Sequence, residues 1–184
     1  MEPHGLKEEA PSDWVARWLP EPSGPGRLLD FACGAGRHAR LAAGRGFRVL
    51  ALDRDPACLA LDDIPGIEAR TADLESATWD FVSERFSVIV VTRYLFRSRL
   101  DLLAGLLAEG GWLIYETFAA GNGRYGKPSN PAFLLQSDEL LTLARRAALQ
   151  VCAFEQGIVR FPRPALVQRI AARRGGGPAN LDRR

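Results

Sequence analysis

A short apolar run that passes into a glycine turn is the feature that most restricts how this chain can fold. Residues 27–31 read Arg-Leu-Leu-Asp-Phe, Ala-Cys-Gly-Ala-Gly follows at 32–36, and a helix-forming stretch continues to Arg45. An apolar run bounded by turn residues is typical of a buried strand. The two glycines let the backbone turn sharply and approach a ligand closely, because glycine has no Cβ. The segment therefore predicts a strand, a tight turn and a helix whose free N–H groups face that turn.

Strand and helix patterns then alternate along the chain. The alternation predicts a mostly parallel sheet covered on both faces, with the ligand outside the carboxyl ends of the strands. Long irregular loops inside compact domains are often functional, so we expect the Gly-, Asn- and Pro-rich segment 118–136 to close over a site. The further strands are predicted at Phe47–Leu52, Ile67–Thr71, Phe86–Thr92, Trp112–Thr117, Gln150–Gln156 and Leu166–Ala171, and the later helices begin at Pro56, run over Leu100–Ala108 up to Gly110–Gly111, and run from Ser137 to Ala148.

The length of 184 residues favours one domain around a single core. We expect a flexible leader at 1–11, a domain at 12–172 and a disordered tail at 173–184. Ser12 and Asp13 can cap a short helix that carries two tryptophans on one face.

Charge, cysteine content and hydropathy narrow the class of protein. The formal net charge of +2 lacks the basic excess of a nucleic-acid binder. The three cysteines have no metal-ligand spacing and their odd number argues against a disulfide framework, so we expect no metal site and a cytoplasmic location. No apolar run is long enough to span a bilayer. The sequence leaves the oligomeric state open between monomer and homodimer.

An acidic residue at the end of the second predicted strand completes a nucleoside-binding edge. Asp53 can accept both hydroxyls of a ribose. Residues 34–39 also satisfy the loose dinucleotide fingerprint, which is weak on its own. Two further acids, Asp30 in the first strand and Asp73 after the third, and the lack of a second domain for a hydride acceptor favour another nucleoside cofactor over a nicotinamide.

These residues resemble a known family. Asp30 to Gly36 looks like the first motif of class I S-adenosylmethionine-dependent methyltransferases, Asp53 matches their ribose-binding acid, and Asp73-Leu74 matches the pair that binds the adenine edge. Gly110 to Ile114 resembles the turn and fifth strand of that fold. Among these enzymes, the chain looks most similar to small bacterial tellurite-resistance-type methyltransferases.

The resemblance implies a three-layer Rossmann-like sandwich whose seven-stranded, mostly parallel sheet has its last strand antiparallel. It implies S-adenosyl-L-methionine as cofactor, with the methionine part against the 30–36 loop. The residues expected to bind the cofactor are Asp30, Ala32, Cys33, Gly34, Gly36, Asp53, Arg54, Asp73, Leu74 and Thr92.

The expected acceptor is a small molecule, such as a thiol, a chalcogen oxyanion or another small anion. Thr92-Arg93-Tyr94-Leu95-Phe96 stands where many amino-group methyltransferases carry an Asn/Asp-Pro-Pro-aromatic motif, so an amide or nucleobase amine fits less well. The residues able to face the acceptor follow the fourth and fifth strands, and they are Arg93, Tyr94, Arg97, Glu116 and the loop that carries Asn122, Arg124 and Tyr125. Of these, we expect Arg93 or Arg124 to hold an anion, Tyr94 to wall the methyl group or donate a hydrogen bond, and Glu116 to act as a base.

Several of these residues are also compatible with purely structural roles. The glycines can form a plain strand–helix turn, Asp73 can cap a helix, and Arg93 can belong to a solvated rim. Cys33 is expected to pack rather than react, and His38 to be a surface or satisfied histidine. The alternative functions are an RNA or protein methyltransferase, an NAD-dependent reductase, and a non-catalytic cofactor-binding scaffold.

Overall fold

The structure is a computed structural model that describes residues 9–22, 24, 26–76, 78–175 and 177. The first eight residues of the predicted leader and residues 178–184 of the predicted tail lie outside these ranges. Within them, the last strand continues to Arg174, two residues beyond the predicted end of the domain.

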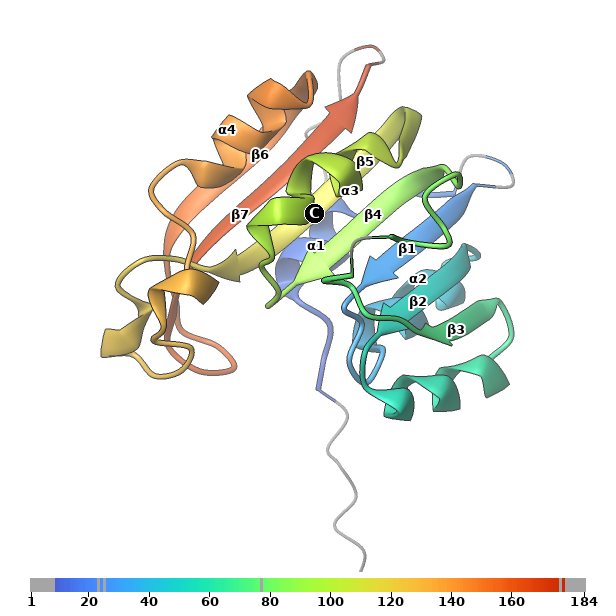
Figure 1. Ribbon diagram of the computed structural model, residues 1–184, viewed down its shortest axis with the longest axis horizontal. Coiled ribbons are helices and arrows are strands. Elements are labelled where there is room, and N and C mark those ends of the chain that lie inside the picture. Colours follow the sequence, from blue (N-terminus) through green and yellow to red (C-terminus); the bar gives the residue numbers. More distant parts are fainter. Residues whose placement is uncertain (1–8, 23, 25, 77, 176, 178–184) are drawn as a thin grey trace, which may run out of the picture.

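One seven-stranded sheet with the order β3-β2-β1-β4-β5-β7-β6 forms the middle of the molecule (Figure 1). The first five strands pair in parallel, and β7 pairs antiparallel with both of its neighbours. This arrangement confirms the predicted mostly parallel sheet with its last strand antiparallel. The strands are β1 (Arg27–Phe31), β2 (Arg48–Asp53), β3 (Ile67–Thr71), β4 (Phe86–Thr92), β5 (Leu107–Phe118), β6 (Leu149–Val159) and β7 (Ala165–Arg174).

Helices cover both faces of the sheet, which gives the three layers that were predicted (Figure 1). Alternate strand residues point to opposite faces, so Leu28 and Val49 pack with the helices of one face while Leu29 and Leu50 pack with those of the other. The first face carries α1 (Asp13–Trp18), α2 (Arg37–Gly44) and the 3₁₀ helix η1 (Pro56–Asp63), and the second carries α3 (Leu100–Gly105) and α4 (Glu139–Arg146).

The predicted boundary between the helix at 100–108 and the fifth strand is wrong. The helix ends at Gly105, and β5 already begins at Leu107, which pairs with Phe86. A register shift follows between Phe86 and Val88, where a Cβ on Gly111 would lie 2.8 Å from the carbonyl oxygen of Ala108. The glycine pair therefore serves a bulge inside the strand, where backbones approach closely, and does not end the helix.

The segment 118–136 is more regular than the sequence indicated. It contains the 3₁₀ helices η3 (Asn122–Arg124) and η4 (Pro131–Phe133). The buried Asn122 amide donates to the Pro128 carbonyl over 2.9 Å and accepts from the Leu166 N–H over 3.0 Å. From the other side, the Arg97 guanidinium donates to the carbonyls of Ala132 and Leu134 and pairs with Glu139. These bonds tie the segment to β7 and α4 and hold it beside the carboxyl ends of the strands.

Candidate functional site

A cavity of about 580 Å³ opens at the carboxyl ends of β1, β2 and β4. Parallel strands bring the residues that follow them to one edge of the sheet, which is where α/β proteins bind ligands. Of the residues predicted from sequence, the cavity is lined by Ala32, Cys33, Gly34, Asp53, Arg54, Asp73, Leu74, Thr92, Arg93 and Tyr94. Asp30, Gly36 and Glu116 are not among its lining residues.

A hydrogen bond joins the turn after β1 to Asp53, the last residue of β2. The N–H of Gly34 donates to Asp53 Oδ2 over 2.7 Å, and the N–H of Asp55 donates to Oδ1 over 3.0 Å. Each carboxylate oxygen keeps a further lone pair, so the oriented, half-buried carboxylate at the cavity can still accept two hydroxyl groups. Gly34 has a φ of +53°, and a Cβ placed on it would meet no atom within 4 Å. The turn therefore leaves space beside Asp53 that suits a ribose.

Gly36 has a packing role that the sequence did not indicate. Its φ is +78°, and a Cβ on it would lie 2.4 Å from both methyl carbons of Leu61. Leu61 is buried in η1. Gly36 therefore lets η1 pack against the start of α2, and it is not among the residues that line the cavity.

Asp30 lies beneath the turn and not on its ligand side. The side chain is 1% exposed, and Oδ2 has no hydrogen-bond partner among the described residues. Burial raises the pKa of this carboxyl to about 7, although the backbone N–H of Ala39 in α2 donates to it. Asp30 thus joins β1 to the first turn of α2, and any contact it makes with the methionine part of a cofactor stays a prediction.

His38 is a buried, neutral histidine. Nε2 accepts the Ser12 N–H over 3.1 Å, so the ring proton lies on Nδ1, which is 3.4 Å from Thr92 Oγ1. Burial lowers the pKa of His38 to about 3. The histidine is therefore satisfied, as one of the two alternatives supposed, and connects the start of α1 to the end of β4.

The two buried groups give the stability of the fold opposite pH dependences. Between pH 3.8 and about 7 the folded chain keeps the Asp30 proton that the unfolded chain has released, so the free energy of unfolding falls as pH rises. His38 acts in reverse between about 3 and 6.5, because only the unfolded chain binds its proton there. We expect Asp30→Asn to remove the decrease in stability with pH that Asp30 causes. The contribution of His38 then remains, so the free energy of unfolding should rise by up to about 1.4 kcal/mol per pH unit below pH 6.5.

Urea unfolding of both proteins at pH values from about 4 to about 8 measures this difference. His38→Gln is the matched control. It keeps the contribution of Asp30 and removes that of His38, so its free energy of unfolding should fall as pH rises. A gap between wild type and Asp30→Asn that stays constant over the whole range would contradict the assignment.

The turn after β3, which carries Asp73 and Leu74, forms another part of the cavity wall. Asp73 Oδ1 accepts the N–H of Glu75 over 3.0 Å in a local turn, and no helix follows it within residues 74–76. Leu74 is buried, and its carbonyl accepts from the indole N–H of Trp79 over 3.3 Å. The turn therefore offers an acid and an apolar wall, the pair expected beside an adenine.

Tyr94 brings an unsatisfied hydroxyl to the cavity. Within the part of the chain that the structure describes, its buried Oη has no hydrogen-bond partner, and its ring packs edge-on against Phe31 at 5.5 Å between centroids. Burial, and then the charges of Glu75 and Asp73, raise the pKa of Tyr94 to about 12. The phenol therefore stays protonated at neutral pH and can donate to a ligand but cannot act as a base.

Arg93 follows β4 with a left-handed φ of 55°, and its N–H donates to the Glu116 carbonyl over 3.0 Å. Its guanidinium forms a bidentate pair with Glu9, at 2.7 and 2.5 Å. Arg37, the first residue of α2, reaches the same carboxylate at 3.1 Å. Two arginines of the cavity thus share one acid from the segment before α1.

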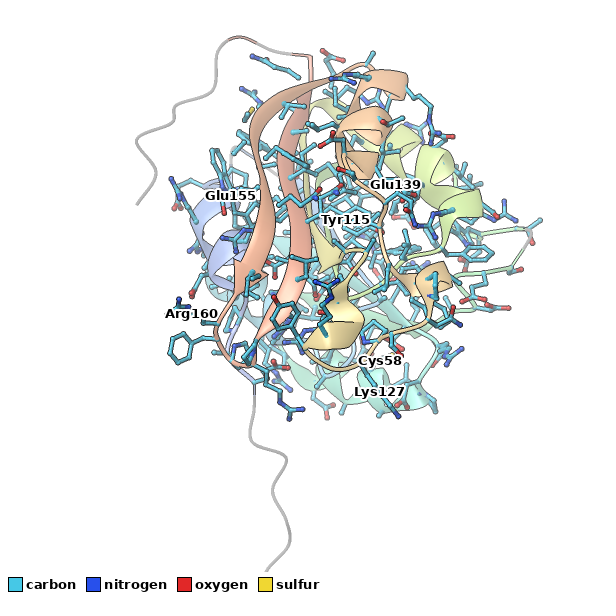
Figure 2. All side chains as sticks on the ribbon, turned by 90° about the vertical axis from the view of Figure 1, so that its left-hand side faces the viewer. Cys58, Tyr115, Lys127, Glu139, Glu155 and Arg160 are labelled. Atoms are coloured by element: carbon cyan, nitrogen blue, oxygen red, sulfur yellow. The ribbon has the colours of Figure 1, made fainter. Side chains whose placement is uncertain are left out.

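Glu116 does not have the environment expected of a base. Oε1 accepts from the Ser12 hydroxyl over 2.8 Å, and Oε2 pairs with Arg169 at 3.2 Å. Arg169 also pairs with Glu155 on the outer strand β6 (Figure 2). Because both oxygens are engaged outside the cavity lining, Glu116 holds α1 and β7 together at the end of β5.

The cavity wall includes residues that were not singled out from the sequence. Phe118, Pro128 and Phe133 belong to segment 118–136, which was expected to close over a site. Outside that segment, the residues not singled out are Glu9, Ala35, Arg37, Glu75 and Leu95. Of these, Arg37 directly follows the glycine turn, and that position was the available signal for it. Within the described residues, no group of three or more His, Cys, Asp or Glu side chains is placed to hold a metal ion, and no helix is long and apolar enough to cross a membrane.

The chain matches one family of known sequences over most of its length. Residues 4–175 match the model of a family described as "Methyltransferase domain". No curated protein matches the sequence significantly.

Solved structures share the fold at low sequence identity. TehB from Haemophilus influenzae is 18% identical with a TM-score of 0.68, and the match covers 83% of this chain and 58% of that one. An S-adenosylmethionine-dependent methyltransferase from Mesorhizobium loti is 18% identical with a TM-score of 0.67, covering 87% and 95%. The 1,6-didemethyltoxoflavin-N1-methyltransferase of Burkholderia thailandensis, solved with S-adenosylhomocysteine, is 18% identical with a TM-score of 0.60, covering 83% and 72%.

The chain spans less than two thirds of the TehB chain but most of the other two. With the family match over nearly the whole sequence, and with a cavity whose turn, acids and unpartnered hydroxyl suit a nucleoside, the chain belongs to the class I S-adenosylmethionine-dependent methyltransferases.

Proposed function

We propose that this methyltransferase transfers the methyl group to a small, anionic acceptor that Arg93 helps to hold. The single observation that carries the proposal is the bidentate grip of Arg93 on a carboxylate at the edge of the cavity. Planar guanidinium groups bind planar anions in this manner. The family match supports methyl transfer over the nicotinamide alternative.

The positions of the residues around the cavity suggest the role of each in binding the cofactor. Asp53 would accept the ribose hydroxyls, Asp73 and Leu74 would face the adenine, and Tyr94 would donate a hydrogen bond to the cofactor. S-adenosylmethionine would supply a methyl group on a positively charged sulfonium that leaves as a neutral thioether. The protein then has mainly to align acceptor and methyl, which is worth effective molarities of about 10⁵–10⁸ M.

The surroundings of the acceptor favour a nucleophile that needs no strong base. Glu116 is engaged by Ser12 and Arg169, and the Tyr94 phenol is protonated. Burial also raises the pKa of the Cys33 thiol well above its ordinary value, and we propose that Cys33 packs against the cofactor. A thiolate or a chalcogen oxyanion, which is nucleophilic as it stands, suits such a site better than an alcohol or ammonium group.

Methyl transfer from labelled S-adenosylmethionine to a panel of acceptors tests the proposal. The panel contains thiols with and without a carboxylate, selenite and tellurite, and neutral amines. We expect turnover of an anionic member, and we expect Arg93→Gln to raise KM for it by about tenfold or more, since hydrogen bonds to charged groups are worth about 1.5–3 kcal/mol. Arg145→Gln, a change in an exposed arginine of α4 outside the cavity lining, is the control. Equal turnover of neutral amines by wild type and Arg93→Gln would contradict the proposal.

A further inference from the structure

The acid between the two cavity arginines comes from a short segment of the chain itself. Glu9 lies before α1, in a stretch with no helix or strand, and its side chain is 42% exposed. The next attachments along the chain are the Ala10 carbonyl, which accepts from Arg37 over 3.3 Å, and Ser12, whose N–H and hydroxyl donate to His38 and Glu116. Glu9 can therefore leave the arginines without any change in α1 or the sheet.

Loss of this ion pair should cost more free energy on the side of the two arginines than on the side of Glu9. The Arg37 side chain is only 13% exposed, and burial together with the charge of Arg93 lowers its pKa. Charges held together in a partly desolvated place are costly unless an opposite charge compensates them. Glu9, in contrast, is exposed enough to be solvated by water after it leaves. Arg163, in the turn between β6 and β7, adds to the positive potential on the Glu9 carboxylate.

Arg37 and Arg93 line the cavity and do not lie only on the outer surface. The cavity that Gly34 lines, in the turn proposed to bind the cofactor, is also lined by Glu9, Arg37 and Arg93. The wall also contains Phe118 at the end of β5 and Phe133 in η4. A glutamate side chain in this place is a carboxylate on a short alkyl arm, entering a pocket whose other walls are largely apolar.

We propose that Arg37 and Arg93 form a carboxylate clamp, and that Glu9 fills this clamp from within the chain until the carboxylate of a ligand displaces it. The proposal rests on the proposed function. It adds Arg37 to the binding groups and makes the segment before α1 a displaceable stopper. The displacing carboxylate belongs either to the acceptor or to the amino acid part of the cofactor, and the two sources can be distinguished.

Calorimetric titrations of wild type and Glu9→Gln provide the test. Glutamine keeps the size of the side chain but not the charge that holds it. S-adenosylhomocysteine carries the amino acid carboxylate, 5′-methylthioadenosine lacks it, and benzoate is the probe for an acceptor carboxylate. Benzoate is titrated into the free protein and into protein saturated with S-adenosylhomocysteine. Asp13→Asn removes an exposed acid from the same end of the chain and is the matched control.

We expect Glu9→Gln to tighten one carboxylate ligand by about fivefold, the factor for a partly exposed ion pair of about 1 kcal/mol. A gain for S-adenosylhomocysteine but not for 5′-methylthioadenosine assigns the clamp to the cofactor. A gain for benzoate on the saturated protein assigns it to the acceptor. In either case Arg37→Gln in the Glu9→Gln background should cancel the gain.

Unchanged or weaker binding of all carboxylates in Glu9→Gln would overturn the clamp. The outcome is separate from a failure of the proposed function, because 5′-methylthioadenosine reports on the nucleoside site without the clamp. Benzoate binding to the free protein reports on the clamp without the nucleoside site.

Discussion

Replacing Gly36 by alanine should unfold much of this protein under conditions where Gly34→Ala leaves it folded. The added Cβ at residue 36 would lie 2.4 Å from two carbons of Leu61, and the φ of +78° disfavours any side chain. Strain in the left-handed region costs about 1–2 kcal/mol, and overpacking of a buried side chain costs about 1–3 kcal/mol. We therefore expect a loss of about 2–5 kcal/mol in the free energy of unfolding.

Gly34→Ala is the matched control for this prediction. Gly34 also has a positive φ, +53°, but its Cβ would point into open space. It should cost only the backbone strain, about 1–2 kcal/mol, while weakening cofactor binding by occupying the space beside Asp53. Chemical unfolding and calorimetry of the two variants separate the effects. Equal stability of the two would show that Leu61 does not restrict residue 36.

The second large effect concerns Asp53. Asp53→Ala removes the acceptor proposed for both ribose hydroxyls and releases the N–H of Gly34 that now bonds to it over 2.7 Å. Hydrogen bonds to a charged group are worth about 1.5–3 kcal/mol, so we expect the Kd for S-adenosylhomocysteine to rise by about 10- to 100-fold or more.

Asp55→Ala is the control for Asp53→Ala. Asp55 stands two residues further along, and its side chain caps η1 by accepting the N–H of Ala57 over 2.9 Å, outside the cavity lining. Its loss should cost about 0.5–2 kcal/mol of stability without a change in affinity. Unchanged affinity in Asp53→Ala, measured by calorimetry on folded protein, would rule out its ribose-binding role.

The fold was largely predictable because the hydrophobic pattern and the topology agree. β1, β3 and β4 occupy the predicted residues, since each is an apolar or alternating run bounded by turn signals. The junction before β5 was mispredicted because Gly110 and Gly111 are typical both of a helix end and of a bulge. Only the pairing of Leu107 with Phe86, a contact between distant parts of the sequence, decides between them.

Residues of the candidate site could be predicted where they belong to a short sequence motif. The turn at 32–34 and the acid at the end of β2 carry their chemistry in a short motif, and they line the cavity together. The expected base, Glu116, was placed correctly at the end of a strand, but the position does not reveal that Arg169 of β7 pairs with it. Glu9 could not be found at all, because only the folded chain brings it to Arg37 and Arg93.

The measurement that tests the central claim most directly is a calorimetric titration of the wild-type protein with S-adenosylhomocysteine and, in parallel, with NADH. If the cavity is a methyltransferase cofactor site, S-adenosylhomocysteine should bind with a micromolar Kd, about −8 kcal/mol, and NADH should give no binding heat. Tight binding of NADH with no heat from S-adenosylhomocysteine would contradict the account of the turn after β1 and of Asp53.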